Sequence, residues 1–179
     1  VRETSFKADD SKTSFSGYRA SDGWGGRRKV YYYIECSEKV VSTYQTSGLG
    51  NNANRMRDGD DVTLVELGFG KGDAPIEVRV GISATSVEDA KKNLQAEIPT
   101  WDFPGTRKKT EAAWSKALGK IDTQFPDTAT ARTFYSNLYL SLLAPNIFNN
   151  ADGSYLGFDH KVHANPGYTT YSTFSLWDT

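Results

Sequence analysis

The spacing of apolar residues changes near residue 83, from a period of two to the helical period of 3.6, and this change limits the chain to a mixed fold. Before it, apolar side chains from Ile76 to Ile82 alternate with Glu77, Arg79 and Gly81, the pattern of a strand with one apolar face buried. After it, Ser86-Val87-Glu88-Asp89 has the form of a capping box and opens an amphipathic helix, which Pro99 ends. We therefore predict an α+β chain with one part at 1–83 and a second at 84–179.

Residues 1–83 are predicted to be β-structure. The runs 29–36 and 62–69 are rich in β-branched and aromatic residues, and clusters of Gly, Asn and Asp bound them at 21–26 and 57–60. Short strands joined by tight turns pair in antiparallel sheets. We expect this sheet to be one layer of a β-sandwich.

Residues 84–179 are predicted to add two further helices and a turn-rich segment. The second helix spans about Thr106 to Gly119, with an apolar stripe that includes Trp114. The third follows Asp127, which can cap it, and ends before Pro145. Turn formers at 149–153 then precede a short hairpin or loop at 155–163.

Composition excludes several classes of function. The formal net charge is −1 and the basic residues are scattered, so the chain offers no basic face to nucleic acid. No stretch approaches the ~20 apolar residues of a membrane span. Cys36 is the only cysteine, which rules out an internal disulfide or a thiolate metal cluster, and its place in a strand-like run predicts a buried thiol.

Titratable residues on the helices and loops do not by themselves define a site. Glu88, Asp89, Glu97 and Glu111 fall on predicted helices, where capping, pairing and exposure explain carboxylates without catalysis. Asp152, Asp159, His160 and His163 gather near one loop, but their spacing matches no zinc or EF-hand pattern. We interpret them as turn and loop residues, with a secondary role near a bound ligand as the alternative.

From Val80 onward the sequence contains a series of motifs. They are Val80-Gly81-Ile82-Ser83, Ser86-Val87-Glu88-Asp89-Ala90, Asn93-Leu94, Glu97-Ile98, Trp101-Asp102-Phe103, Phe134-Tyr135, Leu138-Tyr139, Leu142-Leu143-Ala144-Pro145-Asn146, Asp152-Gly153-Ser154-Tyr155 and Tyr171-Ser172-Thr173-Phe174-Ser175-Leu176-Trp177-Asp178-Thr179. Together they resemble glycoside hydrolase family 92, the calcium-dependent, inverting exo-α-mannosidases of bacteria. The sequence departs from the family pattern at Leu140, where His is usual, and at Asn150, where Asp is frequent.

The resemblance implies a large β-sandwich, linking helices and then an (α/α)6 catalytic barrel. This chain would hold the end of the sandwich, the linker and the opening of the barrel, as a piece of a longer polypeptide. The family pattern places Trp177 and Asp178 against the terminal mannose, whereas their alternative roles are a core side chain and a helix cap. The general acid and base of the resemblance lie beyond Thr179, so no catalytic residue is assigned here, and no calcium ligand can be named.

The expected function is therefore part of an inverting exo-α-mannosidase that removes terminal, α-1,2-linked mannose from glycans, with calcium as cofactor. The resemblance also implies a secreted, periplasmic or cell-surface protein. The 179-residue chain is expected to be inactive on its own. The alternative function is a non-catalytic carbohydrate-binding or structural β-sandwich module, which would have no need of the motifs from Leu138 to Thr179.

Overall fold

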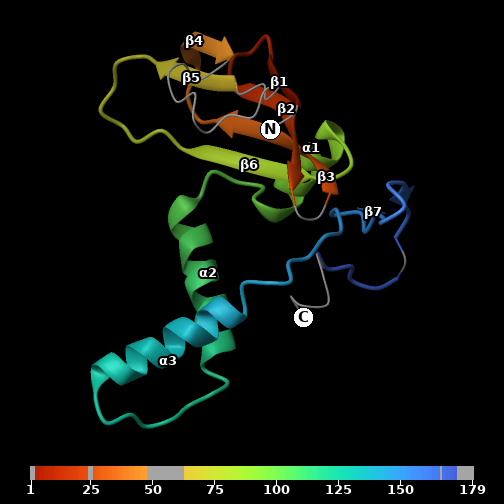
Figure 1. Ribbon diagram of the computed structural model, residues 1–179. Helices are drawn as coiled ribbons and strands as arrows, with labels where there is room; N and C mark the ends of the chain where they lie inside the picture. The colour runs from red at the N-terminus through yellow and green to blue at the C-terminus, as the bar shows by residue number, and fades with distance from the viewer. Residues whose placement is uncertain (1–2, 24–25, 48–62, 166, 173–179) are drawn as a thin grey trace, which may run out of the picture. The chain divides into compact units, whose positions relative to one another are not determined.

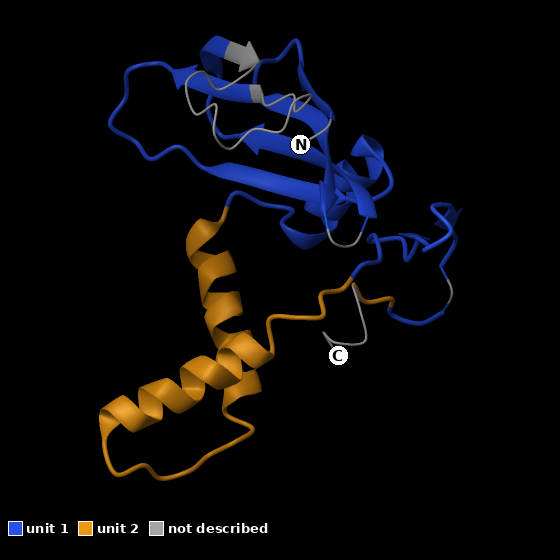
Figure 2. Cartoon of the chain, viewed as in Figure 1, with its two compact units in different colours: residues 1–101, 148–169 blue, residues 102–147, 170–179 orange. Residues whose placement is uncertain are grey.

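The computed structural model describes residues 3–23, 26–47, 63–165 and 167–172 (Figure 1). The elements in chain order are β1 (Glu3–Ala8), β2 (Ser14–Gly23), β3 (Gly26–Cys36), β4 (Val40–Ser47), β5 (Thr63–Phe69), β6 (Val78–Ser83), α1 (Val87–Glu97), α2 (Phe103–Leu118), α3 (Thr128–Ser141), β7 (Tyr155–Leu156) and β8 (Val162–His163). They form two compact units (Figure 2): residues 1–101 with 148–169, and residues 102–147 with 170–179. The predicted α+β class is confirmed.

Two antiparallel sheets pack together in the first unit, which also contains α1 and the two-stranded sheet β7–β8. One has the strand order β1-β2-β3-β6, and the other pairs β4 with β5. Buried Phe15, Cys36 and Val40 join the two sheets, and they pack against Phe6, Ile34, Leu67 and Phe69. This is the predicted sandwich portion. The Cys36 side chain belongs to its core, where burial raises the pKa of the thiol.

Helix α1 begins at the predicted cap and packs on the four-stranded sheet. The Ser86 hydroxyl accepts a hydrogen bond from the Asp89 amide at 3.0 Å. Ala90 and Leu94 are the buried apolar residues of the helix, and they lie against β6 at Gly81. A β-carbon on Gly81 would be 2.1 Å from the Ala90 carbonyl oxygen and 2.7 Å from the Leu94 Cβ. The missing side chain at residue 81 therefore permits this close approach.

The predicted orientation of β6 was wrong. Gly81 and Ser83 are buried under α1, whereas Val78, Val80 and Ile82 on the opposite face are 53%, 49% and 62% exposed. The helix covers the face that carries Gly81 and Ser83, because these small residues let the helix backbone come close. Among the described residues, the β4–β5 sheet packs on Phe15 and Cys36 of the adjacent strands β2 and β3, and not on the apolar residues of β6.

The second unit contains α2 and α3, which contact each other through aromatic rings. Helix α2 begins at Phe103, earlier than predicted, because Asp102 caps it by accepting from the Gly105 amide at 2.9 Å. Helix α3 begins after Asp127 as predicted, with the carboxylate 2.8 Å from the Thr130 amide nitrogen. The Trp114 and Tyr139 rings lie 4.5 Å apart between their centroids.

The boundary between residues 83 and 84 marks the change from strand to helix, but it does not divide the compact units. Helix α1 belongs to the first unit, and so does the segment 148–169 that returns after α3. The assignment of 1–83 and 84–179 to separate domains of the whole protein stays a prediction. Among the described residues, no helix is both long and apolar enough to cross a membrane.

Candidate functional site

Trp177 and Asp178, the predicted sugar-binding pair, lie outside the described residues, as does the motif from Thr173 onward. The structure does describe the segment that leads to them. Tyr171 bridges to Ile147 in antiparallel fashion, and the Ser172 amide donates to the Asn146 carbonyl at 2.8 Å. The Ser172 hydroxyl accepts from the Asn146 amide at 3.1 Å in return. The segment that follows α3 is thus paired with the segment that precedes the predicted motif.

A buried polar network anchors the segment 148–155 to α1 and β6. Its centre is Asn150, which is 8% exposed. The Asn150 Oδ1 accepts from the Ser83 hydroxyl at 2.7 Å and from Asn93 Nδ2 at 3.0 Å. The Asn150 Nδ2 donates to Thr85 Oγ1 at 2.9 Å and to Ser154 Oγ at 3.0 Å. All donor and acceptor sites of this amide are therefore used within the first unit.

Two carboxylates close the network on its outer side. Asp89 Oδ2 accepts from the hydroxyls of Thr85 and Ser86, at 2.7 and 2.8 Å. The bond from Thr85 is the main reason that the pKa of Asp89 is lowered, and the hydroxyl of Ser86 and the ammonium of Lys92 lower it further. Asp152 Oδ1 accepts from the Ser154 hydroxyl at 2.6 Å, and this bond lowers its pKa. Both carboxylates are held ionised and act as acceptors.

The hairpin formed by β7 and β8 carries the other predicted titratable residues. Asp159 Oδ1 lies 2.9 Å from His163 Nε2, and this contact is the main cause of the lowered pKa of Asp159. The His163 ring stacks on Tyr155, with centroids 5.3 Å apart. His160 has a left-handed backbone with φ of 59°. These observations agree with turn and loop roles.

The described residues do not gather into a metal centre. No group of three or more His, Cys, Asp or Glu side chains in this part of the chain could hold an ion. Asp152 and Asp159 instead use their oxygens on Ser154 and His163. The described part of the protein therefore does not fit a calcium site.

The four helix carboxylates named from the sequence divide into two kinds. Asp89 belongs to the cap of α1 and to the buried network. Glu111 pairs with Arg107 at 2.8 Å on the exposed surface of α2, while Glu88 and Glu97 are exposed on α1. None of them is assigned to catalysis.

Sequence reasoning missed the Asn150 network. The residues that form it come from β6, α1 and the loops beside them, and its longest bond joins positions 67 apart, so no local pattern joins them. The one available signal was the resemblance, which marked Asn150 as a departure from the family pattern. The network shows that the residue at this position is a buried structural partner of α1.

The comparisons with known proteins identify the class of the chain. The model of the "Glycosyl hydrolase family 92 catalytic domain" matches residues 89–179. An "uncharacterized secreted glycosidase" of Arthroderma benhamiae is 36% identical over 78 residues, which cover 41% of this chain and 10% of that protein.

Solved structures agree with the family match. A family GH92 alpha-mannosidase from Bacteroides thetaiotaomicron superposes with a TM-score of 0.80 at 30% identity, over 99% of this chain and 24% of that one. A family GH92 inverting mannosidase from Bacteroides thetaiotaomicron VPI-5482 gives a TM-score of 0.74 at 24% identity, over 94% of this chain and 24% of that one, and supports the fold alone.

The family match, together with the sandwich portion and the helices, assigns the chain to a glycoside hydrolase family. It belongs to glycosyl hydrolase family 92. The chain spans 24% of the length of the solved relative that superposes at 30% identity and 10% of the curated relative. The family's catalytic-domain match begins within α1, which packs on the sandwich.

Proposed function

We propose that this chain is part of an inverting exo-α-mannosidase that releases terminal mannose from α-1,2-linked glycans. The observation that carries the proposal is the superposition of 99% of the chain on a family GH92 alpha-mannosidase, with a TM-score of 0.80. The same solved protein has also been seen in complex with mannoimidazole. A non-catalytic sandwich module would not account for the catalytic-domain match over residues 89–179.

Inversion requires two carboxyl groups on opposite faces of the sugar. One donates a proton to the leaving oxygen and the other activates a water, and they stand roughly 6.5–9.5 Å apart. We place both groups beyond Thr179, so this chain alone has no catalytic pair. Its contribution to the proposed site is Trp177, which would pack on the C–H face of mannose, and Asp178, which would accept hydrogen bonds from sugar hydroxyls.

Calcium is part of the proposal as a cofactor of the whole protein. The described residues do not supply a site for it, so the proposed ligands lie outside this part of the chain. The proposed location is secreted, periplasmic or cell-surface, supported by the similarity to a protein called a secreted glycosidase.

The test compares the full-length protein with the 179-residue chain. Release of mannose from α-1,2-mannobiose is measured for both, with and without a calcium chelator, and α-1,3- and α-1,6-mannobiose serve as comparison substrates. The proposal predicts chelator-sensitive release by the full-length protein, fastest on the α-1,2 linkage, and none by the short chain. Release of mannose by the short chain would show that it contains a catalytic pair, and no release by either would refute the mannosidase activity.

A further inference from the structure

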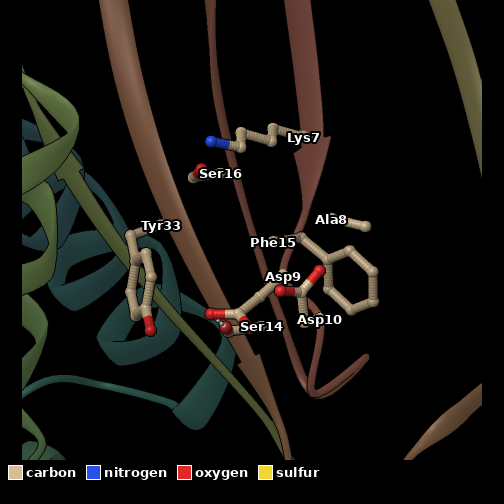
Figure 3. Close-up of a pocket in the computed structure, with 8 residues that line it drawn as sticks. All are labelled: Lys7, Ala8, Asp9, Asp10, Ser14, Phe15, Ser16 and Tyr33. Atoms are coloured by element: carbon tan, nitrogen blue, oxygen red, sulfur yellow. Dashed lines mark hydrogen bonds between the residues drawn. The ribbon is translucent and has the colours of Figure 1, made fainter.

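An open groove lies on the face of the four-stranded sheet that α1 covers only in part. Two adjoining cavities of about 370 and 310 Å³ form it, and both are lined by Ser14 and Tyr33. The strand register sets Lys7, Ser16 and Tyr33 in one row across β1, β2 and β3. Figure 3 shows these side chains around the larger cavity. The groove therefore crosses three strands beside α1.

Trp101 lines the smaller cavity and is 42% exposed. Its ring is held in place by Arg79, whose Cζ atom lies 4.1 Å from the ring centroid. Arg79 is itself fixed, because it donates to the Ile98 carbonyl at 2.7 Å and forms an ion pair with Glu35. An exposed ring with a fixed orientation can stack on a flat apolar surface at little cost in entropy.

Tyr33 supplies a second aromatic ring, and it borders both cavities. Lys91 of α1 lies 5.1 Å from its ring centroid. The two rings thus come from a strand and from the segment after α1, and each is supported by a cationic side chain. Both rings line the smaller cavity, and Tyr33 lines the larger one as well, so one extended ligand in the groove can contact both rings.

Ala8 and Phe15 also line the larger cavity and Cys36 the smaller one, and the remaining lining residues are polar, with charges of both signs. Asp9 accepts from the Ser14 hydroxyl at 3.2 Å and from the Ser11 amide at 3.0 Å, and the Ser11 bond is the main cause of its lowered pKa. The charge of Glu35 is balanced by its ion pair with Arg79, and Lys7 lines the larger cavity together with Asp9 and Asp10. A groove without a dominant charge and with hydroxyls beside aromatic rings favours a neutral, polyhydroxylated ligand.

We propose that this groove binds a neutral oligosaccharide, with Trp101 and Tyr33 stacking on pyranose rings and with Ser14, Ser16 and Asp9 bonding to hydroxyls. Pyranose rings have an apolar C–H face and a polar edge, which match the rings and the hydroxyls of the groove. The inference goes beyond the proposed function, which assigns no ligand to these residues. In a glycoside hydrolase such a groove would hold a longer glycan to the protein.

The test measures binding of soluble α-mannan to the full-length protein by affinity electrophoresis. Saturating free mannose is present, so that any mannose contact at Trp177 and Asp178 is occupied. Trp101→Ala and Tyr33→Ala each remove one ring, and Tyr44→Ala serves as control because Tyr44 is 61% exposed on β4 and does not line the groove. Circular dichroism verifies that each variant is folded, and Tyr33→Ala carries the test if Trp101→Ala does not fold.

The expected result is a loss of mannan affinity of about tenfold or more in each folded groove variant, with Tyr44→Ala like the wild type. A tenfold loss corresponds to about 1.4 kcal/mol. No retention of the wild type by mannan, or equal retention of the wild type and the groove variants, would overturn the inference. Failure of the proposed mannosidase activity is read separately, from release of mannose, because mannan binding needs no hydrolysis.

Discussion

The side-chain oxygen of Asn150 lies 2.7 Å from the hydroxyl of Ser83, 67 residues earlier in the chain. This bond and those to Asn93 and Thr85 tie the segment after α3 to β6 and α1, whereas the fourth bond of the Asn150 amide, to Ser154, lies within the segment. A buried amide with every site used is costly to truncate, because its partners lose their bonds without regaining water.

Asn150→Ala should weaken this attachment by about 1–3 kcal/mol. The measurement is hydrogen exchange of the backbone amides of residues 150–154 in the full-length protein, which reports local opening. Exchange there should become about tenfold faster or more. Gln95→Ala, an exposed amide on α1, is the matched control and should leave the rate unchanged. Equal rates in both variants would mean that the network does not hold the segment.

Gly81→Ala should destabilise the first unit, because a β-carbon at residue 81 would meet the Ala90 carbonyl oxygen at 2.1 Å. The contact is with backbone, so α1 must shift, and overpacking of this kind costs about 1–3 kcal/mol. Thermal unfolding of the full-length protein should show a lower Tm for the transition that includes the sandwich. Gly23→Ala is the control, since a β-carbon there meets nothing within 4 Å. A Tm equal to that of the control would contradict the close packing of α1 on β6.

Asp89→Asn should alter the dependence of stability on pH. The pKa of Asp89 is lowered in the folded protein, chiefly by the Thr85 hydroxyl. Its carboxylate therefore adds stability above the unfolded pKa of about 3.9, and this stability is lost as pH falls through the lower folded pKa. The difference in Tm between pH 5 and pH 3 should be smaller in Asp89→Asn than in the wild type. The control is Glu88→Gln, which removes the same charge from the exposed neighbouring position; an equal change in that variant would point to general helix electrostatics instead.

Local signals in the sequence predicted the starts of α1 and α3 and strands at 29–36, 62–69 and 76–82. They did not indicate β1, β2 or β4, and the turn predicted at 21–26 lies partly in β2 and β3. The caps Ser86 and Asp127 start α1 and α3 as expected, because a cap needs only the next few residues. The exposed face of β6 could not be predicted in the same way. Whether Ile82 or Gly81 is covered depends on the helix that follows in the chain and on how closely it can approach the strand. Gly81 is the one local sequence signal of that close approach.

Predictions that concern the whole chain, rather than a single helix or strand, depended on the family resemblance. It anticipated the class of protein, which the match over residues 89–179 confirms. Neither the resemblance nor the spacing indicated that Asn150 would bond to Ser83 and Asn93, because such a network depends on three segments meeting in space. The role of Trp177 and Asp178 lies outside the described residues and stays a prediction.

Asp178→Asn in the full-length protein decides between the two roles of this carboxylate. If Asp178 accepts hydrogen bonds from mannose, the loss of charge should cost about 1.5–3 kcal/mol of transition-state stabilisation. That cost is a fall in kcat/KM of roughly 10- to 150-fold, and Tm should change little. If Asp178 caps a helix, Tm should fall while kcat/KM is kept. Asp122→Asn, an exposed carboxylate in the second unit, should change neither quantity, so a fall in kcat/KM confined to Asp178→Asn would assign Asp178 to the sugar.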